Sequence, residues 1–455
     1  MLALLIALVV TGWVGYLISK KYPAQPVLIL GGIILMAFTL LLGTGSIINA
    51  KQSTGFAWFD IFEFMKRTLS SRGAGLGLMI MSVAGFAKFM DYIGASRVLV
   101  FLCAKPLAKL KAPYLVMALT YVLGQFLALF ITSASGLGLL LMVTMFPILV
   151  GLGVSPLSAV AVISTTQSLD IGPGSGNSVL SATNAGMDIA NYFAHYQIPV
   201  GLCVVCTVAV LHYLTQQYFD KKQGHEAVDT TANLNSELLE DLPPKIYALL
   251  PCIPLFLILS FSSLGYKAIK MDVVTSMLLT TFIAMICEYI RKRDAMEVMK
   301  SLTKFWDGMG MQFASVITLI VAGEVFANGL KSIGAIKTLI AGAQGLGLGV
   351  SFMVIIMVAI IAVSAIVMGS GNAPFFAFAA LVPEVAQKVG VPAVAMLLPM
   401  QFASSIARSV SPITGVIVAV SGAANISPFE TIKRTAIPMA GAMIANVIAS
   451  FFFCY

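Results

Sequence analysis

Long apolar runs follow one another along the whole chain and are separated by short polar segments. LALLIALVVTGWVGYLI near the start is followed by PVLILGGIILMAFTLLLG, and YALLPCIPLFLILSF opens the second half. Each run approaches the roughly 20 apolar residues that a helix needs to cross a bilayer. About 12 to 14 such segments can be counted, some of them too short or too broken to span. The pattern predicts an all-α polytopic membrane protein.

Four of the apolar segments are interrupted by glycine, serine, asparagine and proline. The interruptions are SASG from residue 133, DIGPGSGNS from 170, GSGNAP from 369 and RSVSPITG from 408. Irregular backbone at membrane depth is tolerated only where protein or a water-filled cavity satisfies its polar groups. We therefore expect two re-entrant hairpins, at 133 and 369, and two broken helices around one binding cavity. Close helix packing through small residues is the alternative explanation.

The interruptions recur in the same order in the two halves of the chain. VAGFAKFMDYIGAS in the first half matches VAGEVFANGLKSIGAI in the second, and a long polar stretch divides the halves. A weak internal match of this kind is typical of secondary transporters built from inverted repeats. The predicted divisions are 1–73 (N-terminal transmembrane helices and a loop), 74–217 (repeat 1), 218–245 (polar linker), 246–310 (transmembrane helices of the second half) and 311–455 (repeat 2).

The composition excludes a soluble protein. Hydrophobic residues make up 59% of the chain and charged residues 10%, with a mean hydropathy of +0.97. A soluble fold of this length cannot bury so much apolar surface. The first run has no basic n-region and no small-residue cleavage site, so it is predicted to be a span and not a secretory signal.

The charged residues are mostly explained by the membrane surface. Much of the net charge of +8 lies in short loops that face lipid headgroups, so it does not indicate a nucleic-acid partner. Lys88, Asp91 and Arg97 cluster near a span end, where long side chains can snorkel. The six cysteines are scattered and the three histidines form no plausible metal cluster, so neither a metal site nor a cofactor is expected.

One arginine lies in a segment that is otherwise apolar or hydroxyl-bearing. Because a buried guanidinium is costly unless it is paired, we expect Arg408 to face the cavity and to meet a carboxylate of the substrate. The alternative is a structural ion pair with Asp170, which occupies a similar position in repeat 1. Asp170 is also the first candidate for binding a coupling proton or cation, and Glu324 is the second. A partly hydrated helix end explains Glu324 equally well.

Several of these motifs resemble a known family. GSGNAPFFAF, ARSVSPITGVIVAVSG and ISPFETIKRTAIP in the second half, with SASGLGLLLMVTMFP and PGSGNSVL in the first, resemble the anaerobic four-carbon dicarboxylate carriers of the C type, a branch of the ion-transporter superfamily. The resemblance covers nearly the whole chain. It implies exchange or proton-linked movement of succinate, fumarate and malate. It also implies a scaffold domain and a transport domain with an elevator mechanism, a homodimer, and the bacterial inner membrane.

Carried over residue by residue, the resemblance implies substrate ligands in all four interrupted segments. They are Ser133, Ser135 and Gly136, then Gly174, Ser175, Gly176 and Asn177, then Ser370, Gly371 and Asn372, and finally Arg408, Ser409, Ser411, Pro412 and Thr414. Two positions depart from the family's pattern, because the family has an acid where Asn177 stands and an apolar residue where Asp170 stands. The displaced acid leaves the coupling ion open between H+ and Na+.

Two other function classes compete with organic-anion transport. A sodium/proton antiporter of related architecture would bind its ions at Asp170 and Glu324 and use Arg408 structurally. An intramembrane serine hydrolase would need a histidine base near a membrane serine, but His195 and His212 are expected at or beyond span ends. The sequence therefore predicts a transporter of a C4-dicarboxylate or another small organic anion, and no enzyme.

Overall fold

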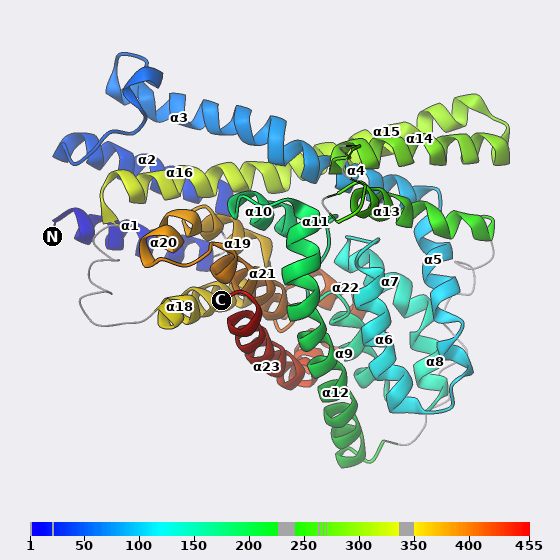
Figure 1. Cartoon of the computed structure of the whole chain (residues 1–455). Helices are drawn as coiled ribbons and strands as arrows, with labels where there is room; N and C mark the ends of the chain where they lie inside the picture. Colours follow the sequence, from blue (N-terminus) through cyan, green and yellow to red (C-terminus); the bar gives the residue numbers. More distant parts are fainter. Residues whose placement is uncertain are drawn as a thin grey trace.

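The computed structural model describes residues 2–20, 22–225, 242–262, 264–266, 268–269, 271–335 and 350–455. All regular secondary structure in these residues is helical (Figure 1). Seven helical segments of the described chain are long and apolar enough to cross a membrane, and four shorter apolar helices accompany them. The predicted all-α polytopic membrane architecture is confirmed.

The helices of the first half are α1 (Leu2–Ser19), α2 (Ala24–Leu42), α3 (Ala57–Arg72), α4 (Leu78–Tyr92), α5 (Ala95–Ala104), α6 (Pro113–Leu127), α7 (Ala134–Thr144), α8 (Phe146–Gly151), α9 (Pro156–Ser164), α10 (Gly176–Asn184), α11 (Ile189–Tyr192) and α12 (Ile198–Lys222). Those of the second half are α13 (Ile253–Ser260), α14 (Val273–Lys292), α15 (Ala295–Gln312), α16 (Thr318–Ser332), α18 (Val350–Met368), α19 (Asn372–Ala379), α20 (Val382–Val389), α21 (Val394–Arg408), α22 (Gly415–Ala423) and α23 (Pro428–Phe453).

Each half begins its repeat with a long helix that contains one π-helical turn. Helix α3 continues through Gly73–Gly77 into α4, and α15 continues through Phe313–Ile317 into α16. The two π turns contact each other, α2 packs on α16, and α4 packs on α15. These helices form one layer of the molecule, along the top of Figure 1. We call this layer, together with α14, the scaffold.

A hairpin and a broken helix follow in each half. In the first half α6 and α7 are joined by a turn at 128–133, and α9 and α10 are separated by 165–175. In the second half α18 and α19 are joined at 369–371, and α21 and α22 are separated by 409–414. Helix α7 packs on α22, and α10 packs on α19, so each hairpin contacts the broken helix of the other half. This reciprocal packing is what a two-fold relation between repeats produces.

Three of the predicted boundaries fall inside helical segments. The boundary after residue 73 falls at the start of a π turn, and the boundary after 310 falls inside α15. GAGLG resembles a helix break by composition, but a packed helix accommodates it as a π turn. Helix α12 runs through Lys222, so the predicted linker 218–245 begins inside a helix. Residues 226–241 of that linker lie outside the described residues.

Glycines let the scaffold helices cross at short distance. A Cβ atom on Gly32 of α2 would lie 2.6 Å from the carbonyl oxygen of Val325 on α16, and one on Gly85 of α4 would lie 2.7 Å from that of Phe305 on α15. Without a hydrophobic force between helices in lipid, such small residues give association its van der Waals contact. The two crossings therefore hold α2 close to α16 and α4 close to α15.

Replacing Gly32 by leucine is expected to lower the thermal stability of the protein in detergent. The added side chain must push α2 away from α16, and overpacking of this kind typically costs about 1–3 kcal/mol. Gly12→Leu is the matched control, because nothing lies within 4 Å of a Cβ atom built on that glycine of α1. Equal melting temperatures for the two variants would show that the crossing at Gly32 is not tight.

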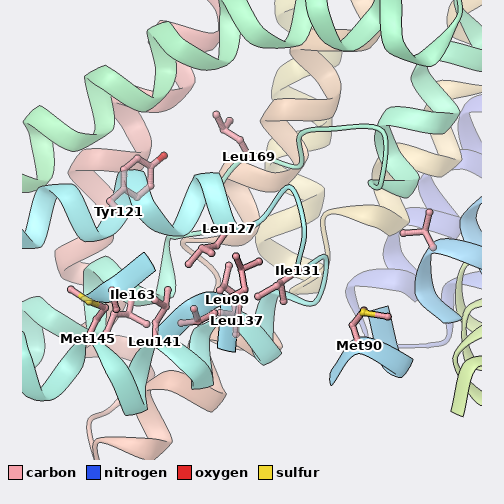
Figure 2. Close-up of a cluster of buried hydrophobic side chains, with 14 of the residues drawn as sticks. Met90, Leu99, Tyr121, Leu127, Ile131, Leu137, Leu141, Met145, Ile163 and Leu169 are labelled. Carbon is pink, nitrogen blue, oxygen red and sulfur yellow. The ribbon is translucent and has the colours of Figure 1, made fainter. Parts of the chain in front are cut away.

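A buried apolar cluster supports the first hairpin and the first broken helix. Figure 2 shows side chains from α6, α7 and α9 and from the two interruptions converging in it. Leu127 ends α6, Ile131 lies in the hairpin turn, Leu137 lies on α7, and Leu169 lies in the break that follows α9. All four are at most 2% exposed, so the irregular backbone is anchored by apolar packing on one side. Its other side is free to line a cavity.

Candidate functional site

A cavity of about 470 Å³ lies where the four interruptions meet the scaffold. The hairpin of the first half contributes Thr132 and Ser133 to its wall, and the first broken helix contributes Asp170 and residues 174–177. Asn372 and Arg408 come from the hairpin and the broken helix of the second half. The cavity is therefore lined by all four interrupted segments at once.

The structure brings about half of the predicted ligands together. Those that line the cavity are Ser133, Gly174, Ser175, Gly176, Asn177, Asn372 and Arg408, with the coupling candidate Asp170. Those that do not line it are Ser135, Gly136, Ser370, Gly371, Ser409, Ser411, Pro412 and Thr414, with the coupling candidate Glu324. The second group lies in the same four segments, Glu324 excepted. Gly371, Ser409, Ser411 and Thr414 are buried in protein, and the others are half-buried.

Several residues of this second group hold the loops in shape. The Ser411 hydroxyl donates to the carbonyl oxygen of Ile366 on α18 (2.7 Å), and the Thr414 hydroxyl donates to that of Arg408 (2.7 Å). A Cβ atom on Gly371 would lie 2.6 Å from the carbonyl oxygen of Ser404, so only glycine fits there. These contacts join the second hairpin to the second broken helix.

Two serines cap the N-termini of helices that face the cavity. Ser133 accepts a hydrogen bond from the backbone N–H of Gly136 at the start of α7 (3.2 Å), and Ser175 accepts one from Ser178 at the start of α10 (3.4 Å). The remaining N–H groups of a helix N-terminus favour negative charge. Two helix N-termini, which favour a bound anion, therefore face the cavity.

Glutamine side chains satisfy the backbone of the first broken helix. Gln401 of α21 donates to the carbonyl oxygen of Asp170 (2.6 Å) and to the Ser178 hydroxyl (3.1 Å). Gln197 donates to the same hydroxyl (2.8 Å) and accepts from the N–H of Gly172 (3.0 Å). Sequence reasoning missed both residues, although Gln401 is an amide in an apolar run and Gln197 immediately precedes one. They show how unwound backbone is stabilised at membrane depth.

Asn177 links the two repeats across the cavity. Its Nδ2 atom donates to Oδ2 of Asp170 (2.8 Å) and to Oδ1 of Asn372 (3.1 Å). Gly172, at φ +101°, turns the chain back between the acid and the amide. The displaced acid noticed in the sequence therefore lies beside Asn177 in space.

Arg408 is a cation with an incomplete set of partners. Its Nη2 atom donates to the carbonyl oxygen of Gln167 (3.1 Å), while its Nε atom is buried without a hydrogen-bond partner in the described chain. The ion pair with Asp170 that the sequence offered as an alternative is not formed, because the Asp170 carboxylate accepts from Asn177 instead. The guanidinium is thus available to an anion in the cavity.

The scaffold forms the opposite wall, with charges that the sequence had explained by snorkelling. Lys88 and Asp91 of α4 and Met311 and Gln312 of α15 line the cavity. The Lys88 ammonium lies 3.2 Å from the sulfur of Met311 and 4.0 Å from a carboxylate oxygen of Asp307. A charged residue at the membrane interface and one that lines a cavity have similar neighbours in the sequence. Only the crossing of α4 with α15 shows that Lys88 and Asp91 line the cavity.

Glu324 lies away from the cavity. Its carboxylate pairs with the guanidinium of Arg72, so it joins α16 to the end of α3 just before the first π turn. This pair belongs to the scaffold. The sequence suggested instead a hydrated helix end near Asn328 and Lys331. It could not indicate Arg72 as the partner, because Arg72 and Glu324 are far apart in sequence and meet only through helix packing.

A second cavity, of about 540 Å³, lies between α10, α11, α13 and α14. Its lining is mostly apolar, and its charged side chains among the described residues are the carboxylates Asp188 and Asp272. A cavity with two carboxylates and no described cation does not suit an anion. Nor do any three His, Cys, Asp or Glu side chains of the described chain gather as a metal site.

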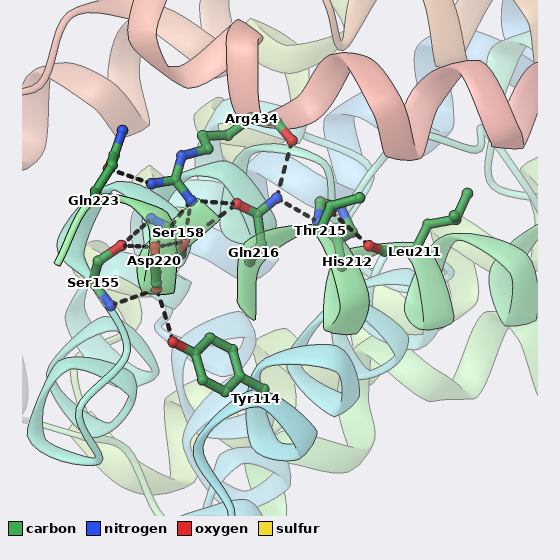
Figure 3. A network of polar contacts seen from close by, with 10 residues as sticks. All are labelled: Tyr114, Ser155, Ser158, Leu211, His212, Thr215, Gln216, Asp220, Gln223 and Arg434. Atoms are coloured by element: carbon green, nitrogen blue, oxygen red, sulfur yellow. Dashed lines mark hydrogen bonds and ion pairs between the residues drawn. The ribbon is translucent and has the colours of Figure 1, made fainter. Parts of the chain in front are cut away.

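A buried ion pair ties together the helices behind the cavity (Figure 3). Asp220 of α12 and Arg434 of α23 are 1% and 2% exposed, and their side chains meet at 2.9 Å. The Asp220 carboxylate also accepts from the hydroxyls of Ser155 (2.7 Å), Ser158 (2.8 Å) and Tyr114 (3.2 Å). The pair therefore joins α6, α9, α12 and α23, and no local pattern in the sequence indicates it.

His212 is buried within α12 and not at a span end, contrary to the expectation from the sequence. Its Nε2 lies 2.9 Å from the Thr165 hydroxyl, which itself donates to the carbonyl oxygen of Val162. Its Nδ1 faces the amide nitrogen of Gln216 at 3.4 Å. This network assigns the proton of a neutral imidazole to Nε2. The hydropathy pattern misplaced His212 because α12 extends further than the apolar run.

Comparison with known proteins identifies the family to which the sequence is similar. The sequence matches the C4-dicarboxylate anaerobic carrier family over residues 2–454. It is 37% identical to the "Probable anaerobic C4-dicarboxylate transporter DcuC" of Vibrio cholerae, over 99% of this chain and 97% of that protein. It is 35% identical to the anaerobic C4-dicarboxylate transporter DcuC of Escherichia coli strain K12, over 98% and 96%.

The fold also has a solved counterpart. The YdaH transporter of Alcanivorax borkumensis superposes with a TM-score of 0.66, covering 94% of this chain and 98% of the other at 15% identity. At that identity the likeness concerns the fold alone. It supports the arrangement of helices around the cavity.

Proposed function

The chain belongs to the C4-dicarboxylate anaerobic carrier family, and from this premise we propose that it is a secondary transporter that moves C4-dicarboxylates through the cavity by alternating access. It is a multi-pass protein of the bacterial inner membrane and a C4-dicarboxylate transporter, not an enzyme. The acids that we propose are succinate, fumarate and malate. They move by exchange, or by symport or efflux coupled to a proton or cation.

One observation carries the proposal: Arg408 lines the cavity without a full set of partners. Its Nε atom has no hydrogen-bond partner, and the guanidinium forms no ion pair with a carboxylate of the described chain. Leaving a guanidinium partly unsatisfied at membrane depth is costly, so the protein retains it for a ligand. Its planar fork matches a carboxylate. Arg408 is the anchor of the first carboxyl group in this proposal.

The second carboxyl group meets groups from the first half. Ser133 and Ser175 present hydroxyls at the starts of α7 and α10, and residues 174–176 present backbone N–H groups at the same wall. Asn372 adds an amide from the second half. Two polar clusters at one cavity suit a short molecule with a carboxyl group at each end.

Movement of the interrupted segments past the scaffold would expose the cavity to the two sides of the membrane in turn. The cavity lies at the boundary between these two units, which supports this arrangement. Helix α16 of the scaffold meets α19 of the second hairpin there: a Cβ atom on Gly323 would lie 2.8 Å from the carbonyl oxygen of Phe376.

Asp170 is the coupling candidate that the cavity geometry supports. Its carboxylate lies in the wall with Arg408, whereas Glu324 is paired with Arg72 in the scaffold. H+ and Na+ both stay open as the coupling ion. The homodimer implied by the resemblance stays a prediction.

Counterflow in liposomes that contain the purified protein tests the function. Vesicles loaded with unlabelled succinate are expected to accumulate labelled succinate, and fumarate and malate are expected to compete more strongly than lactate or citrate. Sodium/proton antiport, the alternative, predicts cation flux without any organic acid. Failure of a folded protein to accumulate succinate, fumarate or malate would overturn the proposal.

A further inference from the structure

Lys88 of α4 is a cation of the cavity wall that has no close carboxylate in the described chain. Its side chain is 37% exposed and lines the cavity from the scaffold. The carboxylate oxygen that pairs with it, on Asp307, lies 4.0 Å away, and its contact at 3.2 Å is with the thioether sulfur of Met311. A thioether is a weak acceptor, and an ammonium has three N–H donors. Lys88 therefore keeps donors for a further partner.

The acids near Lys88 have other cations beside them. Asp307 also lies 3.8 Å from the Lys304 ammonium, and its side chain is 51% exposed, so its charge is shared and screened by water. Asp91, one turn further along α4, has the guanidinium of Arg97 near it at the start of α5. The positive charge of Lys88 is thus only weakly neutralised by the described protein.

The proposed substrate brings a second carboxylate to a cavity with few cations. Arg408 and Lys88 are the cations among the described residues that line it. Arg408 takes the first carboxylate in the proposed function, and the second meets hydroxyls, an amide and backbone N–H groups, none of which carries a full charge. A carboxylate that leaves water is stable when it is both hydrogen-bonded and paired with a cation. Lys88 is the cation that remains for it.

We propose that Lys88 pairs with the second carboxylate of the C4-dicarboxylate, and that this contact makes the carrier select dicarboxylates over monocarboxylates. The inference rests on the proposed dicarboxylate transport, because it assigns one more residue to that substrate. The flexible four-carbon stem of lysine lets the ammonium turn from Met311 and Asp307 to a carboxylate in the cavity. Lys88 is thereby a specificity-determining residue.

The position of Lys88 on the scaffold has a kinetic consequence. Arg408 belongs to the segments that move in the proposed mechanism, whereas Lys88 stays behind with α4. A dicarboxylate held by both residues joins the two units, and its contact with Lys88 must break before the segments cross. Removing a contact that exists in the bound state but not during the crossing raises KM without lowering the maximal rate.

Competition in the counterflow assay tests the assignment. Succinamate carries an uncharged carboxamide in place of one carboxylate of succinate, and its single carboxylate pairs with Arg408. For Lys88→Met the inhibition constant of succinate is expected to rise about tenfold, and that of succinamate to change little. A tenfold change corresponds to the weak end of the range for a hydrogen bond to a charged group, as suits a partly exposed ammonium.

Two further variants control for charge and position. Lys304→Met removes the same charge beside the same acid, Asp307, but Lys304 does not line the cavity, so both inhibition constants are expected to stay unchanged. Lys88→Arg keeps the charge in the wall and is expected to keep most of the preference for succinate. Melting temperatures in detergent report the folding of all three variants.

The maximal rate gives a second readout. At saturating succinate, Lys88→Met is expected to transport at least as fast as the wild type, because the lost contact is absent during the crossing. A lower maximal rate with unchanged inhibition constants would assign Lys88 to packing or to the movement itself, and would overturn the proposal.

The remaining outcomes separate this inference from the proposed function. A folded Lys88→Met protein that keeps the wild-type preference for succinate over succinamate would overturn the role of Lys88 while dicarboxylate transport stands. If the wild-type protein shows no counterflow of succinate, fumarate or malate, both proposals fail.

Discussion

Replacing Arg408 by glutamine is expected to reduce succinate transport about 100-fold or more while leaving the protein folded. In the proposed mechanism the guanidinium anchors one carboxyl group of the substrate, and a hydrogen bond to a charged group contributes about 1.5–3 kcal/mol. Loss of two such bonds amounts to at least two factors of ten in affinity. The fold is expected to tolerate the change because Arg408 makes no ion pair in the described chain and its Nη2 meets only a backbone carbonyl.

The rate of counterflow and the melting temperature together decide this prediction. Arg408→Lys keeps the charge but not the planar fork, so we expect an intermediate loss of transport. Arg67→Gln is the control, because Arg67 pairs with Glu63 on α3 away from the cavity and its loss is expected to leave transport unchanged. Normal succinate transport by a folded Arg408→Gln protein would refute the assignment of Arg408 as anchor.

Replacing Arg434 by methionine is expected to cause the largest loss of stability. It leaves the Asp220 carboxylate buried without its cation, and breaking a buried pair by removing one partner costs about 3–5 kcal/mol. Because the pair joins four helices, its loss is expected to loosen the packing of α9, the first part of the first broken helix, against α12 and α23. The measurement is thermal unfolding in detergent, with the fraction of monodisperse protein after heating as a second readout.

A double variant distinguishes a lost pair from lost packing. Adding Asp220→Asn to Arg434→Met removes the uncompensated charge and keeps an acceptor for the Ser155 and Ser158 hydroxyls, so part of the stability is expected to return. Lys433→Met is the neighbouring control, because that residue is exposed and pairs with Glu430. If Arg434→Met melts like the wild type, the network of Figure 3 does not hold these helices together.

The architecture could be predicted because its signals are local. Apolar length predicts spans, and glycine or proline at membrane depth predicts an interruption wherever the freed backbone groups have shelter. Arg408 could be assigned to the cavity on the same logic, since a guanidinium among apolar residues has few other places to go. These arguments need no knowledge of which helices touch.

The parts that could not be predicted depend on contacts between distant segments. Asp220 falls in the range assigned to the linker, and only the packing of α12 on α23 reveals its partner. Gln401 lies in an apolar run with no sign that it binds the backbone of Asp170 in the other half. Lys88 has the same local surroundings as a snorkelling lysine, and the crossing of α4 with α15 is what brings it to the cavity.

The reciprocal packing of the two halves also bears on how the carrier would move. Helix α7 of the first hairpin packs on α22, and α19 of the second hairpin packs on α10. Under the proposed alternating access, neither hairpin can move alone without giving up its contact with the broken helix of the other half. We therefore expect the two hairpins and the two broken helices to cross as one body.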